Sequence, residues 1–162
     1  MYQINDYLKY GKDVCRVKEI EEKKFNDQDY YLLVPMKDET LKIEIPVTSD
    51  KVQDLISKEE LESLLNKITD IEPIEMEEKF MESEYKRLMS TGEYEDIIKV
   101  IKTTYLRNKA RKENNKKLAE KDINYFQLAE DYLYNEFSVV LGKSYDDTKN
   151  YVITKIDEIL AN

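Results

Sequence analysis

The residue types that carry most enzyme chemistry are scarce in this sequence of 162 residues. It contains no histidine, which excludes Ser-His and Cys-His pairs and histidine metal ligands. Its three glycines are scattered, and no glycine-rich phosphate loop is present. The one cysteine, Cys15, lies in an apolar alternating stretch, where we predict a buried thiol rather than a nucleophile. We therefore expect no enzyme, no catalytic residue, no cofactor and no metal site.

A basic segment, residues 99–121, is the most distinctive charged feature. It holds nine basic and two acidic residues, a balance of +7, whereas the whole chain carries −9 and the remainder therefore −16. Such a segment is either a solvated helix surface or an electrostatic footprint for phosphates. Lysine outnumbers arginine, which favours contacts with the nucleic-acid backbone over base readout. The predicted DNA-binding residues are Lys79, Lys86, Arg87, Lys99, Lys102, Arg107, Lys109, Arg111 and Lys112.

Composition places the chain among soluble globular proteins. Apolar residues make up 41% and charged residues 38% of the sequence. No apolar run approaches the roughly 20 residues that cross a bilayer, and the N-terminus has no secretory pattern. A single cysteine excludes an internal disulfide. We expect a cytoplasmic monomer that makes no contact with a membrane.

The elements that position these residues divide into a β part and an α part, so the predicted fold class is α+β. Two apolar runs, residues 30–34 and 41–45, flank a polar turn and predict a hairpin. Residues 7–10 and 14–22 read as two further strands, residues 23–29 as a charged loop and residues 48–53 as a connector. Four or five short strands predict a small antiparallel barrel or a strongly bent sheet. Small barrels of this kind more often bind another chain than catalyse a reaction.

The rest of the chain predicts about five helices. Ser57 and Glu60 form a capping box before the first of them. The second has an apolar side that includes Phe80 and Met81, and the fifth uses Ile159 and Leu160 among its apolar residues. The predicted helices span residues 58–68, 76–90, 93–112, 118–141 and 147–160. We therefore expect two domains, residues 1–54 and 55–162.

The β part resembles the N-terminal domain of the CarD/CdnL family of bacterial transcription factors, a domain shared with transcription-repair coupling factor. The likeness covers nearly the whole chain and is specific in residues 1–60. It continues in Tyr85-Lys86 and Thr91-Gly92-Glu93, which look like a break found in the family's helical domain. The most specific matches are Met1-Tyr2-Gln3-Ile4-Asn5-Asp6-Tyr7, Tyr10-Gly11, Val14-Cys15-Arg16-Val17, Tyr30-Tyr31-Leu32-Leu33-Val34-Pro35, Ile43-Glu44-Ile45-Pro46-Val47 and Leu55-Ile56-Ser57-Lys58-Glu59-Glu60.

The resemblance implies a Tudor-like N-terminal barrel that binds the β subunit of RNA polymerase. It implies a helical domain that contacts promoter DNA near the upstream edge of the transcription bubble and modulates open-complex stability. The polymerase-binding positions that it implies are Lys23, Lys42, Glu44 and Pro46.

Two departures from the family pattern stand out. Family members place an arginine where Glu44 stands, and a charge reversal at an interface usually lowers affinity unless the partner compensates. The family's wedge tryptophan is also absent, because the chain contains no tryptophan. Its position falls in residues 74–80, where Ile74, Met76 or Phe80 is a candidate apolar wedge or a core residue.

Three hypotheses follow. The favoured one is a regulator tethered to polymerase, whose own binding to free DNA is weak and salt-sensitive because tethering raises its local concentration. The second is an interaction module that binds polymerase, or another partner, without productive DNA contact. The third and least favoured is an enzyme that uses Cys15 or a pair of carboxylates.

Overall fold

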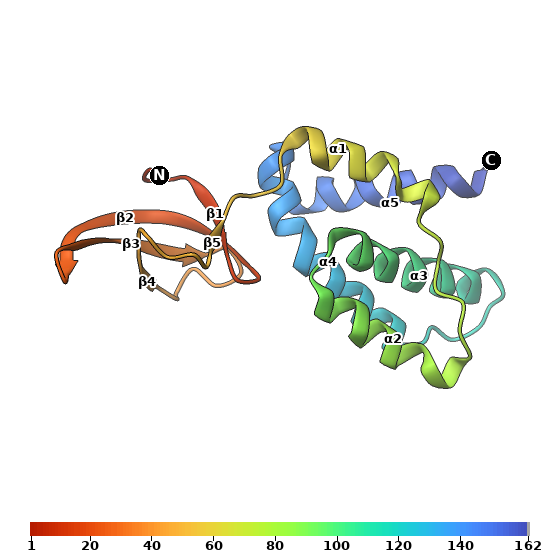
Figure 1. The fold of residues 1–162 in the computed structure, drawn as a ribbon. Helices are drawn as coiled ribbons and strands as arrows, with labels where there is room; N and C mark the ends of the chain where they lie inside the picture. The colour runs from red at the N-terminus through yellow and green to blue at the C-terminus, as the bar shows by residue number, and fades with distance from the viewer. Residues whose placement is uncertain (162) are drawn as a thin grey trace. The chain divides into compact units, whose positions relative to one another are not determined.

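The computed structural model describes residues 1–161, and for residues 159–161 the backbone only. The chain divides into two compact units, Met1–Ser57 and a second that begins at Lys58. The α+β class is as predicted, with strands in the first unit and helices in the second (Figure 1). The division falls three residues after the predicted boundary at residue 54.

The first unit, hereafter the sheet unit, is one antiparallel sheet of five strands. The strands are β1 (Tyr7–Tyr10), β2 (Asp13–Phe25), β3 (Gln28–Pro35), β4 (Ile43–Pro46) and β5 (Val52–Gln53). Their order across the sheet is β4-β3-β2-β1-β5, so β4 and β5 are the two edges, and the predicted barrel is an open sheet in the structure. Two register shifts in the pairing of β2 with β3 increase the local bend and twist of these strands.

Two segments of the sheet unit that were predicted as non-strand contain strand residues. The charged segment 23–29 was expected to be a loop, but β2 and β3 extend through it and turn at Asn26 and Asp27. Both turn residues have positive φ, 52° and 60°, which matches the twist of a two-residue hairpin loop. The connector 48–53 contains β5, which pairs with β1. The predicted pairing of 30–34 with 41–45 is confirmed as β3 with β4.

One apolar face of the sheet carries its core. Leu8 and Cys15 from neighbouring strands are 0% exposed, and Tyr31 is 1% exposed. The N-terminal segment closes this face, because the Tyr2 backbone N–H donates to the Tyr31 hydroxyl at 3.1 Å and the Tyr2 hydroxyl donates to Asp54. The buried cluster consists of Leu8, Cys15, Val17, Tyr31, Leu33 and Ile45.

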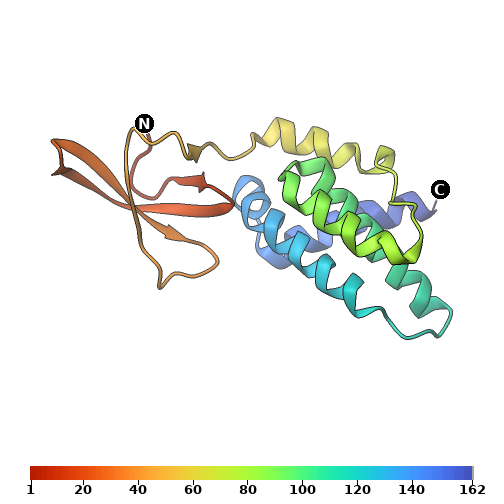
Figure 2. The same ribbon diagram turned by 60° about the horizontal axis from the view of Figure 1, so that its bottom comes forward.

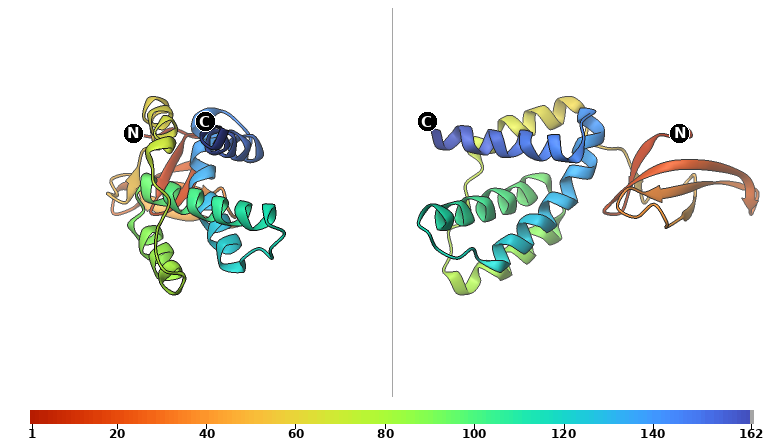
Figure 3. Two further views of the ribbon diagram at one scale, coloured as in Figure 1. Left: turned by 90° about the vertical axis from the view of Figure 1, so that its right-hand side faces the viewer. Right: turned by 180° about the vertical axis from the view of Figure 1, so that it is seen from behind.

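The second unit, hereafter the helical unit, contains α1 (Lys58–Asn66), the short 3-10 helix η1 (Ile68–Asp70), α2 (Glu78–Thr91), α3 (Tyr94–Glu113), α4 (Glu120–Leu141) and α5 (Tyr145–Ala161). Helices α3 and α4 lie side by side and antiparallel, joined by the loop 114–119 (Figures 1 and 2). Helix α5 contacts η1, and it lies close to α1 in both views of Figure 3. No helix in the described part of the chain is both long and apolar enough to cross a membrane.

The helix ends follow local sequence signals. Gly92 ends α2 with φ 70°, and a Cβ at this position would lie 3.0 Å from the Tyr132 hydroxyl. Glycine suits this position for two reasons: it adopts the left-handed backbone conformation without strain, and its lack of a side chain leaves room for the close approach of α4. Gly142 ends α4 in the same left-handed conformation. The predicted core positions Ile159 and Leu160 lie outside the side chains that the structure describes.

Candidate nucleic-acid and protein interfaces

Three of the nine predicted DNA-binding cations, Arg107, Lys109 and Arg111, belong to ion pairs that hold the helices together. The centre of this arrangement is Asp122, which lies in the first turn of α4 and is 0% exposed. Its carboxylate accepts hydrogen bonds from the Tyr85 hydroxyl at 2.7 Å, from Arg107 Nε at 3.0 Å and from Arg111 Nη1 at 2.6 Å. Burial, followed by the bond to Asp122, raises the pKa of Tyr85. Asp122 therefore ties α2 and α3 to α4.

Glu78 extends this network to the surface. Its carboxylate lies 2.5 Å from Lys121 Nζ and 2.6 Å from Arg107 Nη2. Hydrogen bonds from Lys121 and then from Arg107 lower the pKa of Glu78 to about 2. Arg107 is consequently held by one carboxylate on α2 and another on α4, so its guanidinium is a poor candidate for a phosphate contact.

Lys109 faces α5. Its ammonium lies 2.8 Å from Asp157 Oδ1, and the Tyr105 hydroxyl donates to the same carboxylate at 2.8 Å. The bond from Lys109 is the main reason why the pKa of Asp157 is lowered. This pair joins α3 to α5 and neutralises a third predicted DNA-binding cation, after Arg107 and Arg111.

Lys102 is not a surface residue, which corrects its assignment as a DNA contact. Its side chain is 4% exposed, and its ammonium donates to the backbone carbonyls of Ile68 at 2.7 Å and Ile71 at 2.6 Å. These carbonyls belong to η1 and to the residue that follows it, where regular helical bonding stops. Burial lowers the pKa of Lys102. The residue caps η1 from inside the helical unit.

Within the basic segment 99–121, the cations that have neither an ion pair nor a buried backbone partner among the described residues lie mainly near the end of α3. They are Lys112 in the last turn, Lys116 and Lys117 in the following loop, and Lys99 farther back along the helix. Lys112, Lys116 and Lys117 are all exposed. The site prediction named Lys112 but omitted Lys116 and Lys117. The signal that identifies them is the absence of a nearby acidic partner, which only the folded arrangement shows.

The predicted cations of α2 are solvated. The side chains of Lys79, Lys86 and Arg87 are 71%, 68% and 64% exposed and lie near Glu77, Glu82 and Glu84 respectively. These neighbours come from the same chain segment, and exposed pairs of this kind contribute little to stability. All three cations are therefore accessible to a partner.

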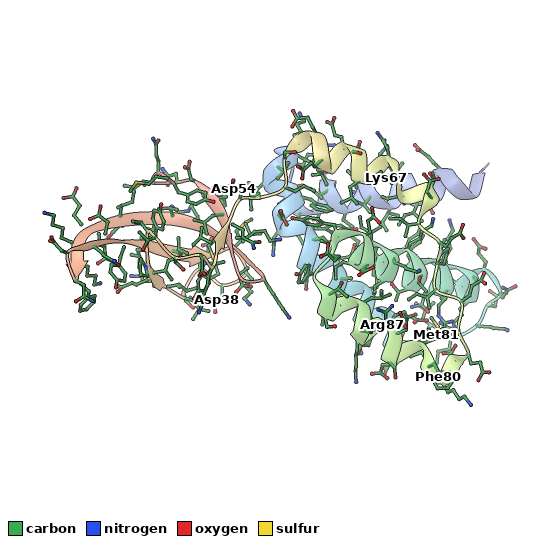
Figure 4. The ribbon with its side chains drawn as sticks, in the orientation of Figure 1. Asp38, Asp54, Lys67, Phe80, Met81 and Arg87 are labelled. Atoms are coloured by element: carbon green, nitrogen blue, oxygen red, sulfur yellow. The ribbon has the colours of Figure 1, made fainter. Side chains whose placement is uncertain are left out.

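The three candidate wedge residues have different surroundings. Ile74 is half-buried, and its backbone N–H donates to the Thr103 hydroxyl at 2.9 Å. Met76 is 48% and Phe80 51% exposed, so the alternative that placed Phe80 in the core is wrong. Figure 4 shows Phe80 at the outer side of α2, and its neighbour Met81 is 1% exposed. Because consecutive residues point in different directions around a helix, Phe80 faces outward while Met81 fills the core position.

The predicted polymerase-binding residues share one edge of the sheet, except for Lys23. Lys42, Glu44 and Pro46 lie on or beside the edge strand β4, whereas Lys23 lies near the β2–β3 turn. The Val47 backbone N–H donates to the Asp29 carbonyl at 3.0 Å, directly across the β3–β4 pair. Because hydrogen-bonded positions alternate along an antiparallel pair, the peptide groups of Glu44 face away from β3.

The Glu44 side chain is paired with a residue that the sequence prediction did not name. Lys24 Nζ lies 2.7 Å from Glu44 Oε1 and 2.7 Å from Glu21 Oε2. The bond from Lys24 lowers the pKa of Glu44. Glu44 stands where the family pattern has an arginine, and Lys24 lies beside it. This edge of the sheet therefore presents an ion pair.

Cys15 is 0% exposed in the sheet core, as predicted. Burial, followed by the charge of Asp13, raises the pKa of its thiol to about 11. A thiol in this state is a poor nucleophile. The described residues include no group of three or more Asp, Glu, Cys or His that is arranged to hold a metal ion.

Comparison of the sequence with protein-family models and with curated proteins returned no match.

Proposed function

We propose that this protein is a transcription regulator of the CarD/CdnL type. The sheet unit, as a Tudor-like domain, binds the β subunit of RNA polymerase, and the helical unit contacts promoter DNA near the upstream edge of the bubble. The observation that carries the proposal is the combination of an open sheet edge in one unit with accessible cations and exposed apolar residues in the other.

The β4 edge supports the polymerase contact. The Glu44 N–H and C=O face away from the sheet and are oriented to pair with an added strand. Pro46 has no N–H and limits the edge to a short pairing, which disfavours uncontrolled association. Glu44 and Lys24 form an ion pair at this edge. Glu44 offers a contact to a basic residue of the partner, and Lys24 offers one to an acidic residue.

The helical unit supports a DNA contact that depends on tethering. Lys112, Lys116 and Lys117 are free for phosphates. Met76 and Phe80 are exposed, as a wedge requires, and the Lys79 ammonium lies over the Phe80 ring. The chain as a whole carries −9, so the affinity of the free protein for DNA is low. Polymerase binding supplies the local concentration.

A second candidate is an interaction module that binds polymerase without productive DNA contact. It is favoured by the internal pairing of Arg107, Lys109 and Arg111 and by the burial of Lys102. These four residues account for much of the apparent basic character of the segment.

One experiment separates the two candidates. In the full chain, Lys112, Lys116 and Lys117 are replaced together by glutamine, and Lys12, Lys58 and Lys67, three exposed lysines elsewhere, are replaced in a control. The regulator predicts that the first variant loses its effect on open-complex lifetime while retaining polymerase binding. It also predicts a weaker salt dependence of duplex binding: the slope of log binding constant against log salt concentration should become shallower by up to about 2.7, which corresponds to three lost phosphate contacts.

An unchanged open-complex lifetime in the first variant favours the interaction module. Phe80→Ala tests the wedge separately and leaves the core intact, because Phe80 is half exposed. Tight, salt-insensitive DNA binding by the free wild-type protein contradicts the tethering argument.

A further inference from the structure

A groove of about 610 Å³ runs between α3 and the beginning of α4. It is lined mainly by apolar surface from Tyr105, Leu118, Ile123 and Phe126. Leu118 is 39% and Ile123 41% exposed. Neither residue is used by the ion-pair network, the wedge candidates or the sheet edge. A volume of this size is typical of a binding site and not of a packing defect.

The length of the groove fits a short helix. Its lining on α3 extends from Thr104 to Glu113. Nine helical steps of about 1.5 Å give roughly 13.5 Å, or two and a half turns. Apolar residues at i, i+4 and i+7 of a partner helix span a little over 10 Å, so three anchors fit within this length.

The charges at the rim favour an acidic occupant. Lys112 lines the groove, and Lys116 and Lys117 immediately precede Leu118. These three lysines have no ion pair in the described part of the chain, and the acidic side chain of the lining is Glu113. An acidic partner is repelled by most of a surface with net charge −9 and attracted at this position.

The aromatic residues of the groove are poorly arranged for stacking with nucleic-acid bases. Lys109 Nζ lies 5.7 Å from the Tyr105 ring centre, and Lys149 Nζ lies 5.4 Å from the Phe126 ring centre. Each ring thus has a cation over one face, and the two rings lie 6.1 Å apart. The apolar lining residues that are most exposed, Leu118 and Ile123, are aliphatic, which suits leucine-like side chains better than bases.

We propose that this groove binds an acidic amphipathic helix of a partner protein. Its apolar side chains pack on Leu118, Ile123 and Phe126, and its carboxylates face Lys112, Lys116 and Lys117. The site is distinct from the sheet edge that we assign to polymerase, but it shares Lys112, Lys116 and Lys117 with the proposed DNA contact, so a partner helix and DNA compete for these lysines. A test that changes the apolar residues leaves every cation of the proposed DNA contact in place, so failure of one proposal does not imply failure of the other.

The test uses the full chain and a fluorescent synthetic peptide of about 14 residues, long enough for four turns. The peptide carries leucine at i, i+4 and i+7 and glutamate on its outer faces, and a scrambled peptide has the same composition. Binding is followed by anisotropy at low salt, without DNA. We expect the periodic peptide to bind at least about tenfold more tightly than the scrambled one, because only it places its leucines on one face.

Ile123→Asp should weaken peptide binding about tenfold or more, and Leu118→Asp gives a second, independent variant in a loop. Leu128→Asp is the matched control, because Leu128 is 56% exposed on the same helix and does not line the groove. Leu128→Asp should change the affinity for the peptide by less than about twofold. Circular dichroism establishes that each variant is folded.

Four results overturn the proposal. They are equal binding of the periodic and scrambled peptides, absence of peptide binding, and equal effects of Ile123→Asp and Leu128→Asp. The fourth is binding of another occupant: a labelled oligothymidine that loses affinity in Ile123→Asp, or a dimer of the chain in sedimentation that the same change abolishes.

Discussion

Replacing Asp122 by alanine removes the acceptor that Tyr85, Arg107 and Arg111 share. The carboxylate is 0% exposed and accepts two charge-assisted bonds and one from a hydroxyl. Removing one partner of a buried ion pair costs about 3 to 5 kcal/mol, because the remaining charges are left uncompensated. The two arginine side chains are 25% and 24% exposed, so water compensates them in part. We therefore expect a loss near the lower limit, about 3 kcal/mol.

The assay is thermal and urea unfolding of the full chain followed by far-ultraviolet circular dichroism, which reports mainly the helical unit. For a unit of this size, about 3 kcal/mol lowers Tm by roughly 12 to 24 °C. Glu78→Ala is the control, since it removes a 59% exposed carboxylate from the same Arg107 and should cost less than about 1 kcal/mol. If Asp122→Ala is no less stable than Glu78→Ala, the central role of Asp122 is refuted.

Three further predictions concern buried polar groups. Burial raises the pKa of Glu130 above its ordinary 4.5, so the folded state binds more protons than the unfolded state and the stability of the wild type falls as pH rises through the folded pKa. Glu130→Gln should therefore become more stable relative to the wild type from pH 4.5 upward. A difference in urea midpoint between the two proteins that shrinks as pH rises contradicts this prediction. Cys15 should react with iodoacetamide on the order of a hundredfold more slowly in the native protein than in urea, and comparable rates would show that the thiol is accessible. Lys102→Glu places a carboxylate against two carbonyls and should destabilise the helical unit by at least about 2 kcal/mol more than Lys99→Glu, measured by urea unfolding; equal losses would place Lys102 at the surface.

The elements of the fold were largely predictable because their signals are local. Apolar residues at helical spacing place α3 and α4 within two residues of their observed ends, and Gly92 and Gly142 end helices as expected. The β2–β3 turn was missed although Asn26-Asp27 is a suitable turn pair, because the charged residues around it suggested a loop. The small size of β5 left no periodicity from which to predict it.

The candidate site was less predictable because it depends on partners from distant segments. The sequence shows that Arg107 and Arg111 are basic, but not that Asp122 lies buried between them. Nor does a lysine among helical residues reveal that Lys102 is directed inward to the end of η1. Phe80 and Met81 are adjacent and similarly apolar, and only the helix rotation observed in α2 separates the exposed one from the buried one.

Binding of the full chain to the purified β subunit of its own RNA polymerase tests the central claim most directly. The wild type is compared with Glu44→Pro, which removes the outward N–H of β4, and with Glu39→Pro. The control lies in the turn closed by the Leu41 N–H and the Asp38 carbonyl, at the position where proline is favoured. We predict micromolar or tighter binding that Glu44→Pro weakens at least tenfold, approximately, and Glu39→Pro leaves unchanged. No binding of the wild type to the β subunit would contradict the account.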